Sequence, residues 1–282
     1  MEHSHGYPQE DILEYDCFCT PETITVDGNL NEPAWLKAPK SPRFGDLVTG
    51  KPGILDTRAA LLWDAGNLYV AFWIEEPDVW ATLTERDSYI WQDNDVEIFI
   101  AGRDAYYEFE INALGTVYEA MWIWKDVFRK GGRYDVAEFD LYNRRVTSLG
   151  DIDLRKHPRG PRWGFLDWDF PGLQARVKVD GTLNKRDDLD RGWTVEIAFP
   201  WEGMKWLAEG RPLPPREGDV WRMDFSRFQN LNFSSPASAY QPDPDEAGLS
   251  VNAAWVWNKH GVYDTHIPER FTKIRFTEEA VS

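Results

Sequence analysis

A tryptophan followed closely by three acidic residues is the part of this sequence best suited to hold a ligand. Trp91 precedes Asp93, Asp95 and Glu97, and the acids lead into an apolar stretch that is typical of a strand. An indole ring can lie against the apolar face of a sugar ring, while nearby carboxylates accept hydrogen bonds from its hydroxyl groups. Trp91 could equally cover a hydrophobic core beside a solvated row of acids. The rest of the sequence favours the sugar-binding interpretation.

The elements that must position these residues are strands, because apolar and polar side chains alternate with a period of two. Turn residues such as Asp27-Gly28 and Asp180-Gly181 separate the alternating segments. The pattern predicts an all-β fold, an antiparallel β-sandwich that forms a single domain over residues 1–282. The apolar positions predict one shared core, with these members: Phe72, Ile98, Phe109, Val177, Ile197, Phe225 and, on the apolar side of its strand, Trp193.

The polar side of several predicted strands is mostly acidic. Glu97, Glu108, Glu110 and Asn112 all alternate with core positions, so they point away from the core. Such a face is either an ordinary solvated surface with cross-strand ion pairs or a platform for a sugar. The whole set favours a platform more strongly than any single member does.

The stretch from about 125 to 171 interrupts the pattern. It is irregular and rich in Arg, Gly, Pro and Asp, and we interpret it as a long inserted loop region. A loop of this length in a compact domain is usually functional or disordered. Its aromatic residues favour an ordered flap; they are Trp163, Phe165, Trp168 and Phe170.

Composition restricts the partners. The formal net charge of -17 argues against nucleic acid and anionic membranes, and it is compatible with neutral sugars or cations. Residues 1–8 lack the basic and apolar segments of a secretory signal, so we expect a cytoplasmic protein, or a secreted one if a leader precedes this sequence.

The two cysteines, Cys17 and Cys19, are expected to be reduced thiols on an early strand, since a disulfide across one residue is strained. Nothing in the sequence determines the oligomeric state.

A carbohydrate-active enzyme is the main alternative to a binding protein. A glycoside hydrolase or lyase needs paired carboxylates across a cleft, and Glu97, Glu108, Glu110 and Glu196 offer several pairs. The sequence contains no His-Glu-x-x-His, no Gly-x-Ser-x-Gly and no phosphate-binding loop. The five histidines show no metal-binding spacing.

Six segments, in order, resemble the family-nine carbohydrate-binding modules and their free-standing bacterial relatives. The resemblance extends from Ile24 to Phe276 and implies a non-catalytic sandwich that binds carbohydrate. The segments are Ile24-Thr-Val-Asp-Gly-Asn-Leu-Asn-Glu-Pro-Ala-Trp35, residues 57–72, Asp93-Asn-Asp-Val-Glu-Ile-Phe-Ile100 with residues 107–112, residues 190–201, Trp221-Arg-Met-Asp-Phe-Ser-Arg227, and Trp255-Val-Trp-Asn258 with residues 266–271.

The resemblance also implies a ligand-binding set. Members that bind sugar clamp it between two tryptophans, with a Glu and an Asn making hydrogen bonds. Trp91 with Glu97 matches one half of this pattern, and Trp255 with Asn252 matches the other, with Trp257 as a rival to Trp255.

Two further features of the family bear on the ligand. Glu108 stands at about the place where sugar-binding members often have an arginine, so the site could differ or be lost, leaving a structural or partner-binding sandwich. Some members hold structural calcium with loop acids, for which Asp64, Asp93 and Asp95 are candidates.

Overall fold

Strands dominate the computed structural model, which describes residues 4–151, 155–230 and 252–282. About 38% of the residues lie in strands and 9% in helices. The elements in chain order are β1 (Glu14–Cys19), α1 (Pro33–Lys37), β2 (Gly45–Asp46), β3 (Thr57–Trp63), β4 (Asn67–Glu75), η1 (Ile90–Gln92), β5 (Asp95–Ala101), β6 (Ala105–Asn112), β7 (Val117–Trp124), η2 (Ala137–Phe139), β8 (Val146–Leu149), β9 (Arg162–Phe165), β10 (Gln174–Asp180), β11 (Gly192–Pro200), η3 (Trp201–Met204), α2 (Lys205–Ala208), β12 (Val220–Asn230), β13 (Asn252–Val256), η5 (Pro268–Arg270) and β14 (Thr272–Ala280).

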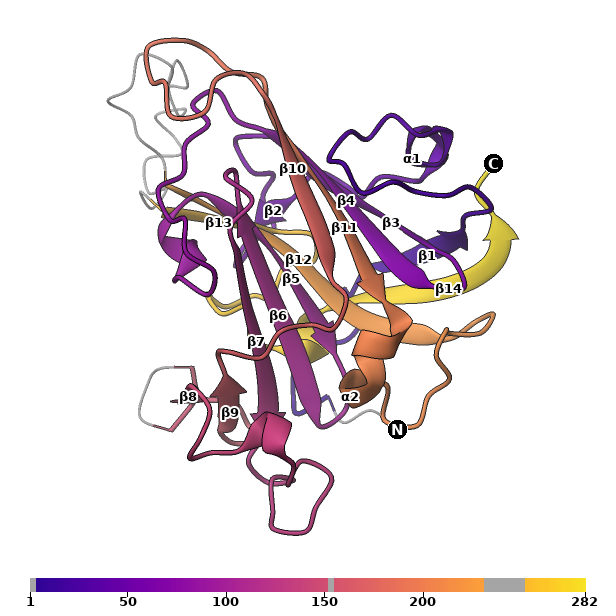
Figure 1. Cartoon of the computed structure of the whole chain (residues 1–282), viewed down its shortest axis with the longest axis vertical. Coiled ribbons are helices and arrows are strands. Elements are labelled where there is room, and N and C mark those ends of the chain that lie inside the picture. The colour runs from indigo at the N-terminus through magenta and orange to yellow at the C-terminus, as the bar shows by residue number, and fades with distance from the viewer. Residues whose placement is uncertain (1–3, 152–154, 231–251) are drawn as a thin grey trace.

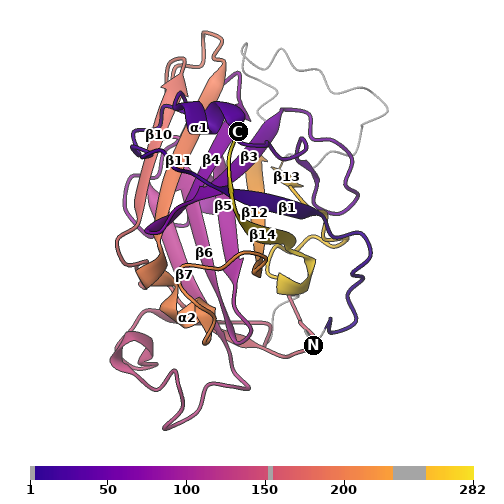
Figure 2. The same cartoon turned by 90° about the vertical axis from the view of Figure 1, so that its right-hand side faces the viewer.

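The strands form two facing layers that are joined along one hydrogen-bonded path (Figures 1 and 2). The order is β10-β11-β4-β3-β1-β14-β12-β5-β6-β7-β9-β8, and β13 pairs with both β12 and β2. The predicted β-sandwich is therefore confirmed. Its strand pairs are antiparallel except at β1, which runs parallel to both β3 and β14. This N-terminal strand lies at the seam where the path passes from one layer to the other.

The core between the layers contains the residues that alternation predicted. Phe72 and Ile197 from one layer meet Ile98, Phe109 and Phe225 from the other, and all five are buried. The rings of Phe72 and Phe225 lie 6.2 Å apart across the layers. Val177 is only partly buried because β10 is the edge strand, but it packs against the same core.

A polar network crosses this core. Arg227 on β12 is fully buried, and its guanidinium lies 3.7 Å from Glu76, the residue that follows β4. Gln229 bonds to both groups, and Trp193 on β11 donates its indole N–H to Glu76 Oε2 over 2.7 Å. These bonds satisfy charged groups that would be costly to bury alone. They also tie three strands of the two layers together.

The region between 125 and 171 is an ordered extension of one layer in its described parts. β9 pairs with β7, and β8 pairs with β9, which lengthens the sheet beyond β7 (Figure 1). Three of the four aromatics in this region are buried, and Trp163 is partly buried beneath Lys125. The expected flap is confirmed as ordered, although its two short strands and β7 itself were not predicted.

Two smaller expectations concern the cysteines and the membrane. Cys17 and Cys19 both lie on β1 and are free thiols, as expected. Within the described ranges, no helix has the length and apolar character needed to cross a bilayer.

Replacing Trp193 with alanine should destabilise the fold by about 3 to 5 kcal/mol, because it empties a core position and removes a hydrogen bond from buried Glu76. Urea unfolding of the wild type and the variant measures the change. Trp91→Ala is the matched control, since its ring is half exposed and its loss should cost less than about 1 kcal/mol. Equal effects of the two substitutions would contradict the placement of Trp193.

Candidate functional site

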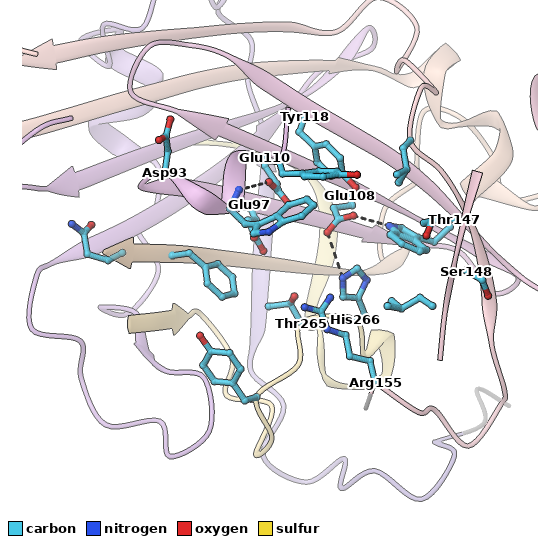
Figure 3. Close-up of a pocket in the computed structure, with 18 of the residues that line it drawn as sticks. Asp93, Glu97, Glu108, Glu110, Tyr118, Thr147, Ser148, Arg155, Thr265 and His266 are labelled. Atoms are coloured by element: carbon cyan, nitrogen blue, oxygen red, sulfur yellow. Dashed lines mark hydrogen bonds and ion pairs between the residues drawn. The ribbon is translucent and has the colours of Figure 1, made fainter. Parts of the chain in front are cut away.

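A cavity of about 450 Å³ lies on the outer face of the layer formed by β12, β5, β6 and β7 (Figure 3). The alternation along these strands creates it. Ile98 and Phe109 point inward to the core, so their neighbours Glu97, Glu108 and Glu110 point outward into the cavity. A volume in this range suits a small organic ligand.

Segments outside the four strands cover this face and make it a pocket. Tyr89 and Trp91 stand on one side, Thr147, Ser148 and Leu149 come from β8, and Tyr263, Thr265 and His266 come from the loop after β13. As a result, Glu97, Glu108 and Glu110 are at most 4% exposed. The acidic face is thus buried, and the expected alternative of a solvated surface with cross-strand ion pairs does not hold there.

Trp91 is held at the pocket mouth by its backbone and by two neighbouring rings. It lies in η1, and its backbone N–H donates to Glu110 Oε2 over 3.0 Å. Its ring stacks on Tyr89 at 4.6 Å between centroids and meets Tyr118 edge-on at 5.4 Å. The side chain is nevertheless 42% exposed. An indole fixed in this way can offer a flat apolar surface to a ligand in the pocket.

Glu108 ends a chain of hydrogen bonds on the pocket floor. Arg162 Nε donates to the Tyr106 hydroxyl, which lies 3.1 Å from His266 Nδ1. If that hydroxyl donates to Nδ1, the proton of the neutral ring is on Nε2, 3.5 Å from Glu108 Oε1. Trp122 donates to the other oxygen of Glu108 over 2.7 Å. Burial raises the pKa of Glu108 to about 7, although this indole hydrogen bond acts in the opposite direction.

Asp95, Glu97 and Glu110 form a tighter carboxyl group beside Glu108. Each offers one oxygen, and these oxygens lie within 4.8 Å of one another. Burial is the main cause that raises the pKa of all three well above the usual value, and for Glu97 and Glu110 repulsion from neighbouring carboxylates comes next. This group can accept hydrogen bonds from hydroxyls and, when protonated, can also donate one.

The loop acids proposed as calcium ligands have other partners. Asp93 accepts hydrogen bonds from the backbone of Thr82 and Leu83 and from the side chain of Asn112, so it braces the loop before η1. Asp64 accepts from backbone N–H groups of its own turn. Of the three candidates, only Asp95 joins a carboxyl group of the kind that can hold an ion among the described residues.

Trp255 and Trp257 do not face Trp91, which corrects the expected clamp. They are 2% and 5% exposed and belong to the sandwich core. The reason is the pairing of β13 with β12, which sets Trp255 opposite Arg227, a residue that points inward. Asn252 begins β13 opposite Asn230, but its side chain is outside the described part of the chain.

Several pocket residues were not foreseen as ligand contacts. Tyr118 and Trp122 lie on the same face of β7, and Phe228 and His266 complete the wall. The period-two spacing of aromatics within 117–124 was a usable signal for β7. Glu196 is excluded from the pocket, since it accepts from the Trp35 indole and from two backbone N–H groups elsewhere in the fold.

Comparison with known proteins agrees with this fold. Residues 57–166, which contain β3 to β9 and much of the pocket floor, match carbohydrate-binding family 9. The chain resembles that family. No curated protein sequence gives a significant match to it.

Solved structures extend the resemblance to nearly the whole chain. A proposed carbohydrate-binding protein from Bacteroides uniformis has a TM-score of 0.57 at 14% identity, covering 94% of this chain and 99% of its own. A family 9 module from Caldicellulosiruptor kristjanssonii, solved in complex with cellotriose, has a TM-score of 0.50 at 12% identity, covering 94% of this chain and 95% of its own. The same organism's family 9 module in complex with glucose also has a TM-score of 0.50 at 12% identity, covering 95% and 98%. At these identities the likeness establishes the fold.

The stability of the protein should fall as the pH rises from about 5 to 8, in part through Glu108. An unfolded Glu has a pKa of about 4.3, whereas burial raises the pKa of Glu108 to about 7. The folded state therefore binds this proton more tightly. The resulting stabilisation is complete below the unfolded pKa and is lost as the pH rises through the folded pKa.

Glu108→Gln should remove part of this pH dependence, on the order of 1 to 3 kcal/mol between the two limits. Urea unfolding at both pH values measures it. Some slope should remain in the variant, because Glu97 and Glu110 have pKa values raised by the same burial. An unchanged slope in Glu108→Gln would contradict the raised pKa.

Proposed function

We propose that this protein binds carbohydrate in the pocket beside Trp91. The observation that carries the proposal is the combination of an exposed, fixed indole with buried hydrogen-bonding groups, inside the stretch that matches carbohydrate-binding family 9. Structural neighbours of that family have been solved with cellotriose and glucose. Residues 1–282 would act as a single binding domain, which the continuous strand path from β10 to β8 supports.

In this proposal, Trp91 supplies the stacking surface. The apolar face of a sugar ring would lie on its exposed side, while Tyr89 holds the indole from the other side. Glu97, Glu108 and Glu110 would take hydrogen bonds from the hydroxyl groups, which would orient the ring and select among sugars. Tyr118 and Trp122 would enclose the ligand in the place that we expected Trp255 or Trp257 to fill.

A glycoside hydrolase remains the second candidate because of one observation. The pocket carboxyls lie close together and have raised pKa values, and a retaining glycosidase uses two carboxyls about 5 Å apart, one of them protonated. The same closeness also serves a binding site, where the groups accept and donate hydrogen bonds without reacting. Turnover is the measurement that separates the two functions.

Trp91→Ala should weaken sugar binding at least about tenfold, or about 1.4 kcal/mol, and leave the fold intact, because the ring is half exposed. Calorimetric titration with glucose, cellotriose and other mono- and disaccharides measures this effect. Glu97→Gln should weaken binding of neutral sugars less, since the amide keeps one acceptor. Trp255→Ala is the contrasting variant: it should lower stability first, since its ring is buried in the core.

The outcomes distinguish the functions. Saturable heat with a sugar, together with no hydrolysis of polysaccharide or aryl glycoside, supports binding alone. Turnover that Glu110→Gln abolishes would assign the pocket to a hydrolase. If neither heat nor turnover is found with any sugar, the sandwich is a structural or partner-binding protein and the proposed function is wrong.

A further inference from the structure

The pocket holds more acidic groups than a neutral sugar needs. Four acidic residues line it, namely Asp93, Glu97, Glu108 and Glu110, and Asp95 lies among them under the floor. The basic side chains in the lining are Arg155 and His266, and burial lowers the pKa of His266 well below its usual value, so the imidazole is neutral. Among the described lining residues, one guanidinium therefore faces four carboxyls. Charged groups that act on the lining residues from outside the pocket are Asp224, Asp264, Arg145 and Arg162. The titratable phenols in the lining are Tyr89, Tyr118 and Tyr263.

The acids differ in how well the protein itself satisfies them. Asp93 has a full set of donors from its own loop, and Glu108 is held between Trp122 and His266. Glu97 accepts from the Ser226 hydroxyl over 3.0 Å, and within the described ranges Glu110 accepts from one donor, the backbone N–H of Trp91.

The strongest sign of an unmet partner is Asp95. Its side chain is fully buried; among the described residues its Oδ2 has no hydrogen-bond partner, and its Oδ1 accepts a 3.3 Å bond from the backbone of Phe228. Its carboxyl lies within 4.8 Å of those of Glu97 and Glu110. A buried carboxylate oxygen without a donor is costly, so this group has capacity for a positively charged donor.

The chemistry of a primary ammonium matches this arrangement. It carries one positive charge and three N–H donors, so it can bond to three carboxyls at once and offset their repulsion. Ring faces beside the carboxyls, those of Trp91, Tyr118 and Trp122, can also attract a cation. A bare divalent ion would want six or more oxygens close around it and would leave most of a cavity of about 450 Å³ unused.

We propose that the ligand is an amino sugar with a free ammonium group, whose ring stacks on Trp91 and whose ammonium lies against Glu97 and Glu110, with the Asp95 carboxyl directly behind them. This assignment rests on the proposed function, and it names the class of sugar that the pocket takes. An N-acetyl group on the same nitrogen removes both the charge and two of the three donors. The site therefore selects a free amine over the acetylated amine and over the hydroxyl of a neutral sugar.

The decisive experiment is calorimetric titration of the full chain with three matched ligands, namely glucosamine, N-acetylglucosamine and glucose. The β-1,4-linked dimers of the same three sugars are titrated in the same way. The titration is run at about pH 6, where an amino group of this kind is protonated. We expect glucosamine and its dimer to bind at least about tenfold more tightly than the other ligands. Added salt should reduce this preference, because the attraction is between charges.

Proton release gives a second readout that a neutral contact would not produce. Burial raises the pKa of Glu97 and of Glu110, so these carboxyls hold their protons more tightly, and a bound ammonium lowers both pKa values again. Titrations in two buffers of different ionisation enthalpy should therefore show protons released with glucosamine and few or none with glucose.

Glu110→Gln tests the site itself. It should remove the preference for glucosamine over glucose and most of the proton release, because a lost hydroxyl contact weakens both sugars whereas a lost carboxylate weakens only the binding of the ammonium. Glu85→Gln is the matched control, since Glu85 is an exposed acid in the loop before η1 and its loss changes net charge equally without touching the pocket. Circular dichroism and urea unfolding confirm that both variants are folded.

The failures are distinguishable. If glucose and glucosamine bind equally, or if Glu85→Gln reduces the preference as much as Glu110→Gln does, the ammonium assignment is wrong and the carbohydrate-binding function stands. If only the N-acetylated sugar binds, the assignment is again overturned. If no sugar of any of the three classes binds, the proposed function fails and the assignment fails with it.

Discussion

The burial of several carboxyls on one face of a sheet is the constraint on which the site depends. Strand geometry alone sends Glu97, Glu108 and Glu110 to the same face, because they alternate with core residues on neighbouring strands β5 and β6. Left open to water, such a row would be ordinary surface. The segments that cover the face bury these carboxyls and so raise their pKa values. Buried carboxyl oxygens need hydrogen-bond donors, and among the described residues Asp95 Oδ2 has none. The pocket and its chemistry both follow from that cover.

The core on the other side of the same strands fixes the geometry of the pocket. Arg227 and Gln229 point inward to Glu76, so Phe228 and Asn230 must point outward, where they line the cavity. The same register turns Trp255 inward through its pairing with Arg227. A buried ion pair adds little net stability in general, but removing one partner is costly. A shift of β12 by one residue would turn Arg227 outward and leave Glu76 without it, so this pair holds the register of β12. The core network thus decides which aromatic rings a ligand can meet.

The insertion supplies part of the pocket wall. β8 and β9 extend the layer past β7, and Leu149, Arg155 and Leu166 bring the insertion onto the pocket. The loop after β13 adds Thr265 and His266 to the pocket wall, and Figure 3 shows Arg155 of the insertion next to them. Glu108 stands between these two covers, tied to Trp122 and His266. An acid at this position is therefore part of a hydrogen-bonded arrangement on the pocket floor.

The sequence by itself determined the layers of this protein and the face on which each strand residue lies. Period-two alternation is a local property, so it predicted the core around Phe72 and Phe225 and the outward direction of Glu97 and Glu108 without knowledge of strand order. Strand β7 was missed because it is mostly apolar on both sides, and the short strands β8 and β9 were missed because they lie in irregular sequence. Pairing between distant strands and the path of long loops were decided only by the tertiary structure. For this reason Trp91 lies at the mouth of a pocket, whereas Trp255 and Trp257 lie in the core. For the same reason, acids that alternation predicts on the solvent-facing side of a strand are buried beneath two loops.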